Sequence, residues 1–214
     1  MHNYPIANNR AMIDLRWCDV FPCDREELEM IMLVQLGFKS IRADAEHLAR
    51  QIVNAVATYR LGASFADAPT IVDCSSFVQW VFAQLGIWLP RYSVDQRDQG
   101  LEVDLNQIQT GDLIFTTGCQ NFFEKDATQG VGHVGILTEF GTVIEANAKR
   151  RRVIEVALEG YITDYRQFRG VRRILPPRED RLILDLADNH EISYAKDVLR
   201  SAQKCIPLQT PVSS

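Results

Sequence analysis

The spacing of apolar side chains changes partway along the chain. From residue 25 to residue 85 they recur every three or four positions, as on one face of an amphipathic helix. This pattern predicts helices over residues 25–38, 43–59 and 74–85. Beyond residue 110 apolar and polar positions alternate, which is typical of half-buried strands. We therefore expect strands over residues 112–117, 133–138, 142–148, 152–157 and 170–175.

Helices followed by an antiparallel sheet predict an α+β fold. We expect the N-terminal helices to pack on a central antiparallel sheet of about five strands. Residues 1–40 form an N-terminal arm and helix in this interpretation, with residues 1–24 loosely structured. Residues 41–177 form the main domain, which ends at a Pro-Pro pair. Residues 178–214 form a C-terminal extension with a helix near 193–204 and disordered last residues.

Composition and charge narrow the function classes. The 214 residues are 46% hydrophobic and 24% charged, which fits one domain of ordinary size with appendages. The net charge of −5 gives no general attraction to nucleic acid. The five cysteines form no CxxC pair and their number is odd, so a reducing compartment is the simpler interpretation.

The sequence also contains no apolar run long enough to span a membrane. Its N-terminus lacks the basic and then apolar pattern of a secretory signal. We therefore expect a cytoplasmic protein, or one exported by a route that needs no such signal.

Cys74 is the first candidate for chemistry. It follows Asp73 and opens a predicted helix, where the helix dipole and nearby N–H groups favour a thiolate. We therefore expect a lowered thiol pKa. The alternative is a buried, inert cysteine.

His133 is the second candidate. It begins a predicted strand between glycines, and a strand-borne imidazole facing Cys74 would form a thiol–imidazole pair. Glu145 lies in the next strand and could accept a hydrogen bond from the imidazole; Asn147, on the same strand face, could take that role instead. The alternative for His133 is an ordinary core histidine.

Several stretches of the chain together resemble one family. The stretches DCSSFVQWVFAQLGIWLPRYSVDQ, TGDLIF and GHVGILTEFGTVIEA, preceded by a tyrosine, occur in order over about residues 43–175. They resemble the NlpC family of cell-wall cysteine peptidases, which are compact relatives of papain. The resemblance implies a papain-like fold for residues 41–177.

The resemblance also implies roles for individual residues. Cys74 matches the nucleophile, His133 the general base and Glu145 the third, orienting residue, which in the family is often histidine. Three further residues match positions that line the site or contact the bound peptide: Tyr59, Asp73 and Ser75. Neither a metal nor a cofactor is implied.

The resemblance implies hydrolysis of peptidoglycan stem peptides or muropeptides through a Cys74 thioester. The bond commonly cut in this family joins D-glutamate to a diamino acid. Two alternatives stay open on the same chemistry: a delivered antibacterial amidase toxin, which would have an inhibitory partner, and an acyltransferase or deamidase acting on a non-wall substrate.

Overall fold

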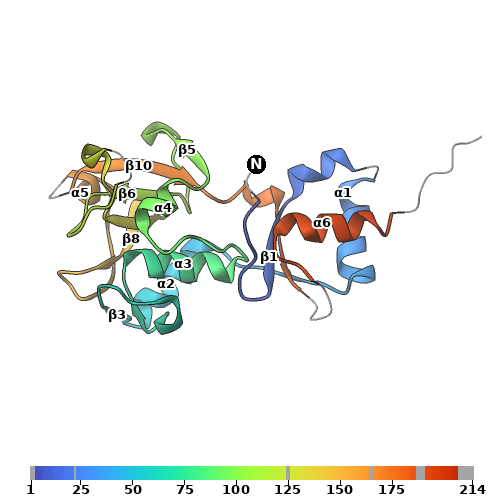
Figure 1. Ribbon diagram of the computed structural model, residues 1–214, viewed down its shortest axis with the longest axis horizontal. Coiled ribbons are helices and arrows are strands. Elements are labelled where there is room, and N and C mark those ends of the chain that lie inside the picture. Colours follow the sequence, from blue (N-terminus) through green and yellow to red (C-terminus); the bar gives the residue numbers. More distant parts are fainter. Residues whose placement is uncertain (1–2, 22, 124–125, 164–165, 187–190, 207–214) are drawn as a thin grey trace, which may run out of the picture.

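The protein is built from two lobes of unequal size (Figure 1). The computed structural model describes residues 3–21, 23–123, 126–163, 166–186 and 191–206. The larger lobe contains the main sheet with helices α2 and α3, and the smaller lobe contains α1 and α6 (Figure 1). None of the helices described is long and apolar enough to cross a membrane.

The main sheet contains all five expected strands, in the order β9-β8-β7-β6-β10. They are β6 (Leu113–Thr116), β7 (His133–Leu137), β8 (Thr142–Asn147), β9 (Arg152–Ala157) and β10 (Phe168–Arg173). The α+β prediction is confirmed.

The expected strand number and the purely antiparallel pairing are wrong. The sheet has eight strands, because β3 and β4 extend one edge and β5 extends the other. These added strands are β3 (Thr58–Tyr59), β4 (Ile71–Val72) and β5 (Leu101–Val103). β3 and β4 run parallel, so the sheet is mixed. Strands of two or three residues are too short to produce a visible alternation in the sequence.

Helices α2 (Ala45–Asn54) and α3 (Cys74–Gln84) contact strands β7 and β8. The α3 prediction is confirmed, but α2 ends before the expected residue 59. Val56 has a φ of 55°, which breaks the helix, and Tyr59 then donates its N–H to the Arg151 carbonyl at the sheet edge. Two short helices were not predicted, α4 (Ser93–Arg97) and α5 (Leu158–Thr163).

The small lobe joins both ends of the chain. β11 (Arg181–Asp185) lies between β1 (Arg10–Asp14) and β2 (Lys39–Ile41), and both pairs are antiparallel. The segment expected to be a loose arm therefore contributes a strand. Its partner lies about 170 positions away, so no local pattern could predict the pairing.

Helices cover this small sheet and enclose a second apolar core. They are α1 (Arg25–Met30), a following π-helical turn over Ile31–Gln35, and α6 (Ala195–Gln203). The core includes Ile13, Leu28, Phe38, Leu184 and Val198. The expected C-terminal helix is confirmed as α6, and the expected disorder of the last residues falls outside the described part of the chain.

Short 3₁₀ turns connect the remaining elements. They span Leu15–Val20, Phe65–Asp67, Leu105–Gln107, Ala127–Gln129 and Arg178–Asp180.

Candidate active site

A cavity of about 260 Å³ lies where the start of α3 meets the start of β7. Its lining brings together six of the residues singled out in the sequence: Tyr59, Asp73, Cys74, Ser75, His133 and Asn147. Glu145, the seventh, lies behind the imidazole, where it is 1% exposed. The chain thus gathers the nucleophile and base candidates from separate elements into one cleft.

The start of α3 holds Cys74 in place. Asp73 caps the helix, because its Oδ1 accepts the Ser76 N–H at 2.8 Å and the Ser76 hydroxyl accepts the Asp73 N–H at 2.9 Å. The Cys74 Sγ lies 3.9 Å from the Gly132 carbonyl oxygen, next to His133 in the chain. The apolar side chains of α3 are buried against the sheet, so the thiol sits on a rigid element.

His133 and Glu145 form a direct pair across neighbouring strands. Nε2 of the imidazole lies 2.5 Å from the Glu145 Oε2. The Asn147 amide donates to the other carboxylate oxygen, Oε1, at 2.9 Å. Glu145 therefore makes the contact with the imidazole, and Asn147 supports Glu145. Because Nε2 is engaged by Glu145, Nδ1 is the ring nitrogen that is left for proton transfer.

Burial sets the protonation of the thiol and the imidazole. It raises the pKa of Cys74 to about 12, with a further contribution from the Asp73 charge. It lowers the pKa of His133, against the hydrogen bond to Glu145. The raised thiol pKa differs from the lowered one expected for a helix start, because desolvation outweighs the N–H groups of Ser75 and Val134.

The two shifts together favour a neutral thiol beside a neutral imidazole in the resting site. Moving the proton from Cys74 to His133 creates one anion and one cation and leaves the net charge of the buried pair unchanged. The pair can therefore ionise together more readily than either group alone.

Glu145 stays ionised in this site. Burial opposes its charge, but the hydrogen bond with His133 and the charges of His133 and Arg166 lower its pKa to about 2. A carboxylate is therefore present to orient the imidazole and to stabilise it when protonated.

Tyr59, Asp73 and Ser75, which were predicted to line the site or contact the peptide, do line the cavity. Two of them, Asp73 and Ser75, are hydrogen-bonded to each other. The Ser75 hydroxyl donates to Asp73 Oδ1 at 3.3 Å. Arg91 bridges both, at 2.7 Å to the Ser75 hydroxyl and 2.5 Å to Asp73 Oδ2. The third residue, Tyr59, is partly buried and burial raises its pKa, so its hydroxyl remains protonated and can donate a hydrogen bond.

The sequence did not indicate Arg166. Its guanidinium lies 2.8 Å from the Glu145 Oε2, and its side chain is only 8% exposed. It stands in an irregular segment just before β10, where no periodicity assigns it a position. The only sequence signal was general: a carboxylate among apolar residues needs a partner.

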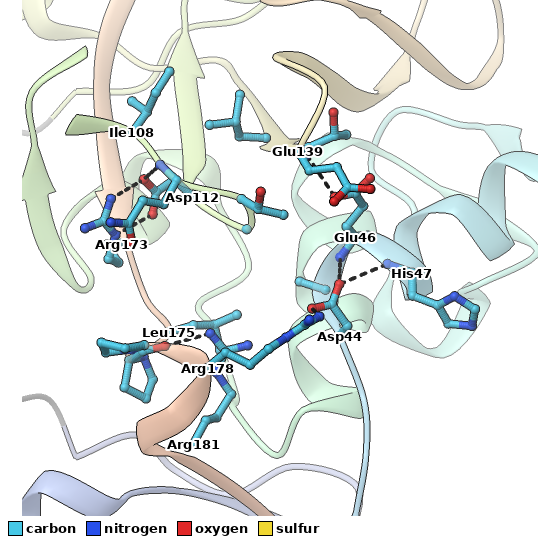
Figure 2. A pocket seen from close by; sticks show the side chains of 18 of the residues that line it. Asp44, Glu46, His47, Ile108, Asp112, Glu139, Arg173, Leu175, Arg178 and Arg181 are labelled. Atoms are coloured by element: carbon cyan, nitrogen blue, oxygen red, sulfur yellow. Dashed lines mark hydrogen bonds and ion pairs between the residues drawn. The ribbon is translucent and has the colours of Figure 1, made fainter. Parts of the chain in front are cut away.

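A second, larger cavity of about 710 Å³ lies at the other end of β7, beside the small lobe (Figure 2). Its charges are largely paired, as between Arg178 and Asp44 at 2.6 Å and between Arg173 and Asp112 at 2.8 Å. No cysteine is among the described residues that line it. The cavity at Cys74 is smaller, but it holds the nucleophile and base, so we take it as the candidate active site.

Comparison with known proteins supplies the family context. Residues 57–172 match the NlpC/P60 family. A gamma-D-glutamyl-L-lysine dipeptidyl-peptidase of Bacillus cereus is 36% identical over 107 residues, which are 49% of this chain and 29% of that protein. A gamma-DL-glutamyl hydrolase of Bacillus subtilis is 31% identical over 115 residues, which are 52% of this chain and 26% of that protein.

A solved structure agrees with the fold. The crystal structure of an NlpC/P60 family protein from Bacillus cereus superposes with a TM-score of 0.51 at 28% identity. The match covers 64% of this chain and 42% of that chain. Among three curated relatives, this chain spans between 14% and 46% of their length, so the likeness concerns only a part of each of those proteins.

Proposed function

The chain belongs to the NlpC/P60 family of papain-like cysteine peptidases, as its motifs predicted, and from this membership we propose that it hydrolyses peptidoglycan stem peptides. The observation that carries the proposal is the placement of Cys74 and His133 in one cleft, with the buried Glu145 carboxylate behind the imidazole. We further propose that the bond cut joins the γ-carboxyl of D-glutamate to a diamino acid. Two relatives are named for action on gamma-glutamyl substrates, which supports this choice.

In the proposed reaction the Cys74 sulfur attacks the amide carbonyl while His133 Nδ1 takes the thiol proton. The tetrahedral intermediate collapses when His133 gives that proton to the leaving amine. This breaks the C–N bond and leaves a thioester on Cys74. His133 then takes a proton from water, the hydroxide displaces the sulfur, and the peptide leaves with a free carboxyl group. The proton returns from His133 to the Cys74 thiolate, which restores the neutral pair.

The oxyanion of the intermediate needs hydrogen-bond donors. The Cys74 backbone N–H lies in the first turn of α3, where N–H groups have no partner within the helix. The Tyr59 hydroxyl, which remains protonated, lines the same cavity. We assign these two groups to the oxyanion, because donors held in a buried site stabilise developing charge strongly.

Purified muropeptides of defined composition test the proposal. We expect mass spectrometry to show new products cut after D-glutamate, and no products with Cys74→Ala. Loss of a nucleophile costs on the order of a million-fold in rate. Cys205→Ala makes the same change at a cysteine of the small lobe, outside the lining of this cavity, and provides the matched control. Cleavage at a different amide bond would reject the proposed bond, and intact muropeptides with the folded protein would reject the proposed substrate.

A further inference from the structure

Arg166 contacts the carboxylate oxygen that also contacts His133. The Glu145 Oε2 lies 2.8 Å from the Arg166 Nη1 and 2.5 Å from the His133 Nε2. The remaining oxygen, Oε1, accepts the Asn147 amide at 2.9 Å. The carboxylate is therefore held by three donors that come from three different segments of the chain.

The guanidinium is itself held in place. Its carbon lies 5.0 Å from the centre of the Tyr161 ring, and that ring lies 5.7 Å from the His133 ring. Tyr161 belongs to α5 and is buried. A cation over an aromatic face is favourable, so Tyr161 stabilises Arg166 in the position where it meets Glu145.

The charges of the cluster balance in both of its working states. We consider the cluster of Cys74, His133, Glu145 and Arg166. With a neutral thiol and a neutral imidazole, its two ions are the Glu145 carboxylate and the Arg166 guanidinium, and their charges cancel. When the proton moves from Cys74 to His133, the new ions also cancel. Buried charges are costly unless they are paired, so Arg166 keeps both states free of an uncompensated charge.

We propose that Arg166 is a positioning residue of this site, which holds the Glu145 carboxylate against His133 and offsets its negative charge. Glu145 and Arg166 together then present a nearly neutral hydrogen-bond acceptor to the imidazole. This proposal extends the proposed function, because it concerns the base of that reaction.

The consequence is a limit on the basicity of His133. A bare carboxylate at this distance would favour the protonated imidazole strongly, whereas a carboxylate shared with a guanidinium favours it less. Titratable and charged groups approach the His133 site from several elements: Tyr59 of β3, Asp73 and Cys74 at the start of α3, Arg91 before α4, Cys119 after β6, Glu145 of β8, Lys149 after β8, Tyr161 of α5 and Arg166. Removing Arg166 should therefore raise the pKa of His133.

An NMR titration of the histidine rings measures this directly and needs no substrate. The chain has four histidines, and His133→Ala identifies the signal. In Arg166→Gln we expect the His133 midpoint to rise by roughly one pH unit, the size expected when a nearby charge is removed. Arg166→Lys keeps the charge and should titrate close to the wild type.

A charge-balanced double variant keeps the test decisive if Arg166→Gln does not fold. Glu145→Gln leaves Arg166 unopposed and should lower the His133 midpoint. Glu145→Gln/Arg166→Gln removes both charges and should bring the midpoint back toward that of the wild type. An equal midpoint in Glu145→Gln and the double variant would overturn the proposal, as would an unchanged midpoint in folded Arg166→Gln.

Activity supplies the second readout. With whichever amide substrate the protein hydrolyses, the acidic limb of kcat/KM, which reports deprotonation of the His133 imidazolium, should move to higher pH in Arg166→Gln. A uniform loss of rate with an unmoved limb would mean that Arg166 only supports the loop. If no muropeptide is cut, the NMR midpoints still decide the role of Arg166, so the two proposals fail separately.

Discussion

At the scale of single residues, the placement of Cys74 and His133 in one cavity makes a chemical prediction. The thiol is buried and its pKa is raised, so its reaction with iodoacetamide depends on an internal base. His133→Ala should slow alkylation of Cys74 at neutral pH by about 100-fold, the lower range for loss of a general base. Peptide mass spectrometry measures the labelling of each cysteine.

Cys119 is the internal control for this experiment. It lines the same cavity but is exposed, so its alkylation should not change in His133→Ala. If Cys74 reacts as fast in the variant as in the wild type, His133 does not accept the thiol proton.

Glu145 and Asn147 can be ranked by their contacts. Glu145 contacts the imidazole, whereas Asn147 acts on the carboxylate. Glu145→Gln should lower kcat by roughly ten- to a thousand-fold, less than the ten-thousand-fold seen for an orienting carboxylate in a serine triad, because a cysteine sulfur is intrinsically more nucleophilic than a serine hydroxyl. Asn147→Ala should cost less. Steady-state kinetics checks both, and the reverse ranking would assign the third role to Asn147.

At the scale of elements, the loop after β6 packs on the glycine that precedes His133. A Cβ on Gly132 would overlap the Gln120 carbonyl and lie 2.7 Å from the Gly118 nitrogen. Gly132→Ala should therefore displace the loop or the Gly132 carbonyl near Cys74. A shift of about 1 Å at a reacting group can cost on the order of 100-fold in rate.

Turnover and thermal unfolding of the Gly132→Ala variant test this expectation together. Gly111→Ala is the control for turnover: at a φ of +89° alanine adds backbone strain, but its nearest neighbours lie at ordinary contact distances of 3.5 and 3.9 Å in a turn away from the cleft. It should therefore lower the thermal stability without lowering turnover. Wild-type turnover in Gly132→Ala would show that the loop does not depend on this close approach.

The elements also explain which parts the sequence could predict. Cys74, His133 and Glu145 occupy regular elements with a clear period, and motifs mark the same positions. Arg166 stands in an irregular segment, where its contact with Glu145 depends on how α5 and β10 bring the chain past the sheet. Sequence periodicity carries information about neighbours along the chain, whereas this contact joins positions 21 residues apart, with β9 and α5 between them.

At the scale of the whole molecule, the sequence pattern also did not predict the strand pairing between distant segments. β1 and β11 each contain a short apolar run, but neither predicts its partner. The family match covers residues 57–172, which do not include the strands of the small lobe, so it gives no expectation for the structure of that lobe. The buried core around Ile13 and Leu184 nevertheless gives this lobe its own hydrophobic stabilisation.

The two lobes meet at the C-terminal end of α3, the helix that carries Cys74 at its other end. Arg10, at the start of β1, donates to the Gln84 carbonyl at 3.0 Å. The Trp88 N–H donates to the Pro5 carbonyl at 3.0 Å. Between these bonds, a Cβ on Gly86 would lie 2.8 Å from backbone atoms of Ala11. The close approach of β1 to α3 therefore requires glycine at this position.

Gly86→Ala tests whether this docking stabilises the protein. Gly86 has a φ of +79°, so alanine adds backbone strain of about 1–2 kcal/mol as well as the clash with β1. Gly141→Ala is the matched control, because its φ is +68° and no atom lies within 4 Å of the added Cβ. Urea unfolding should show a loss of about 1–2 kcal/mol for Gly141→Ala and about 1–3 kcal/mol more for Gly86→Ala, as for an overpacked site. Equal losses in the two variants would mean that β1 is not packed against α3, and the small lobe would then contribute no stability to the helix that positions Cys74.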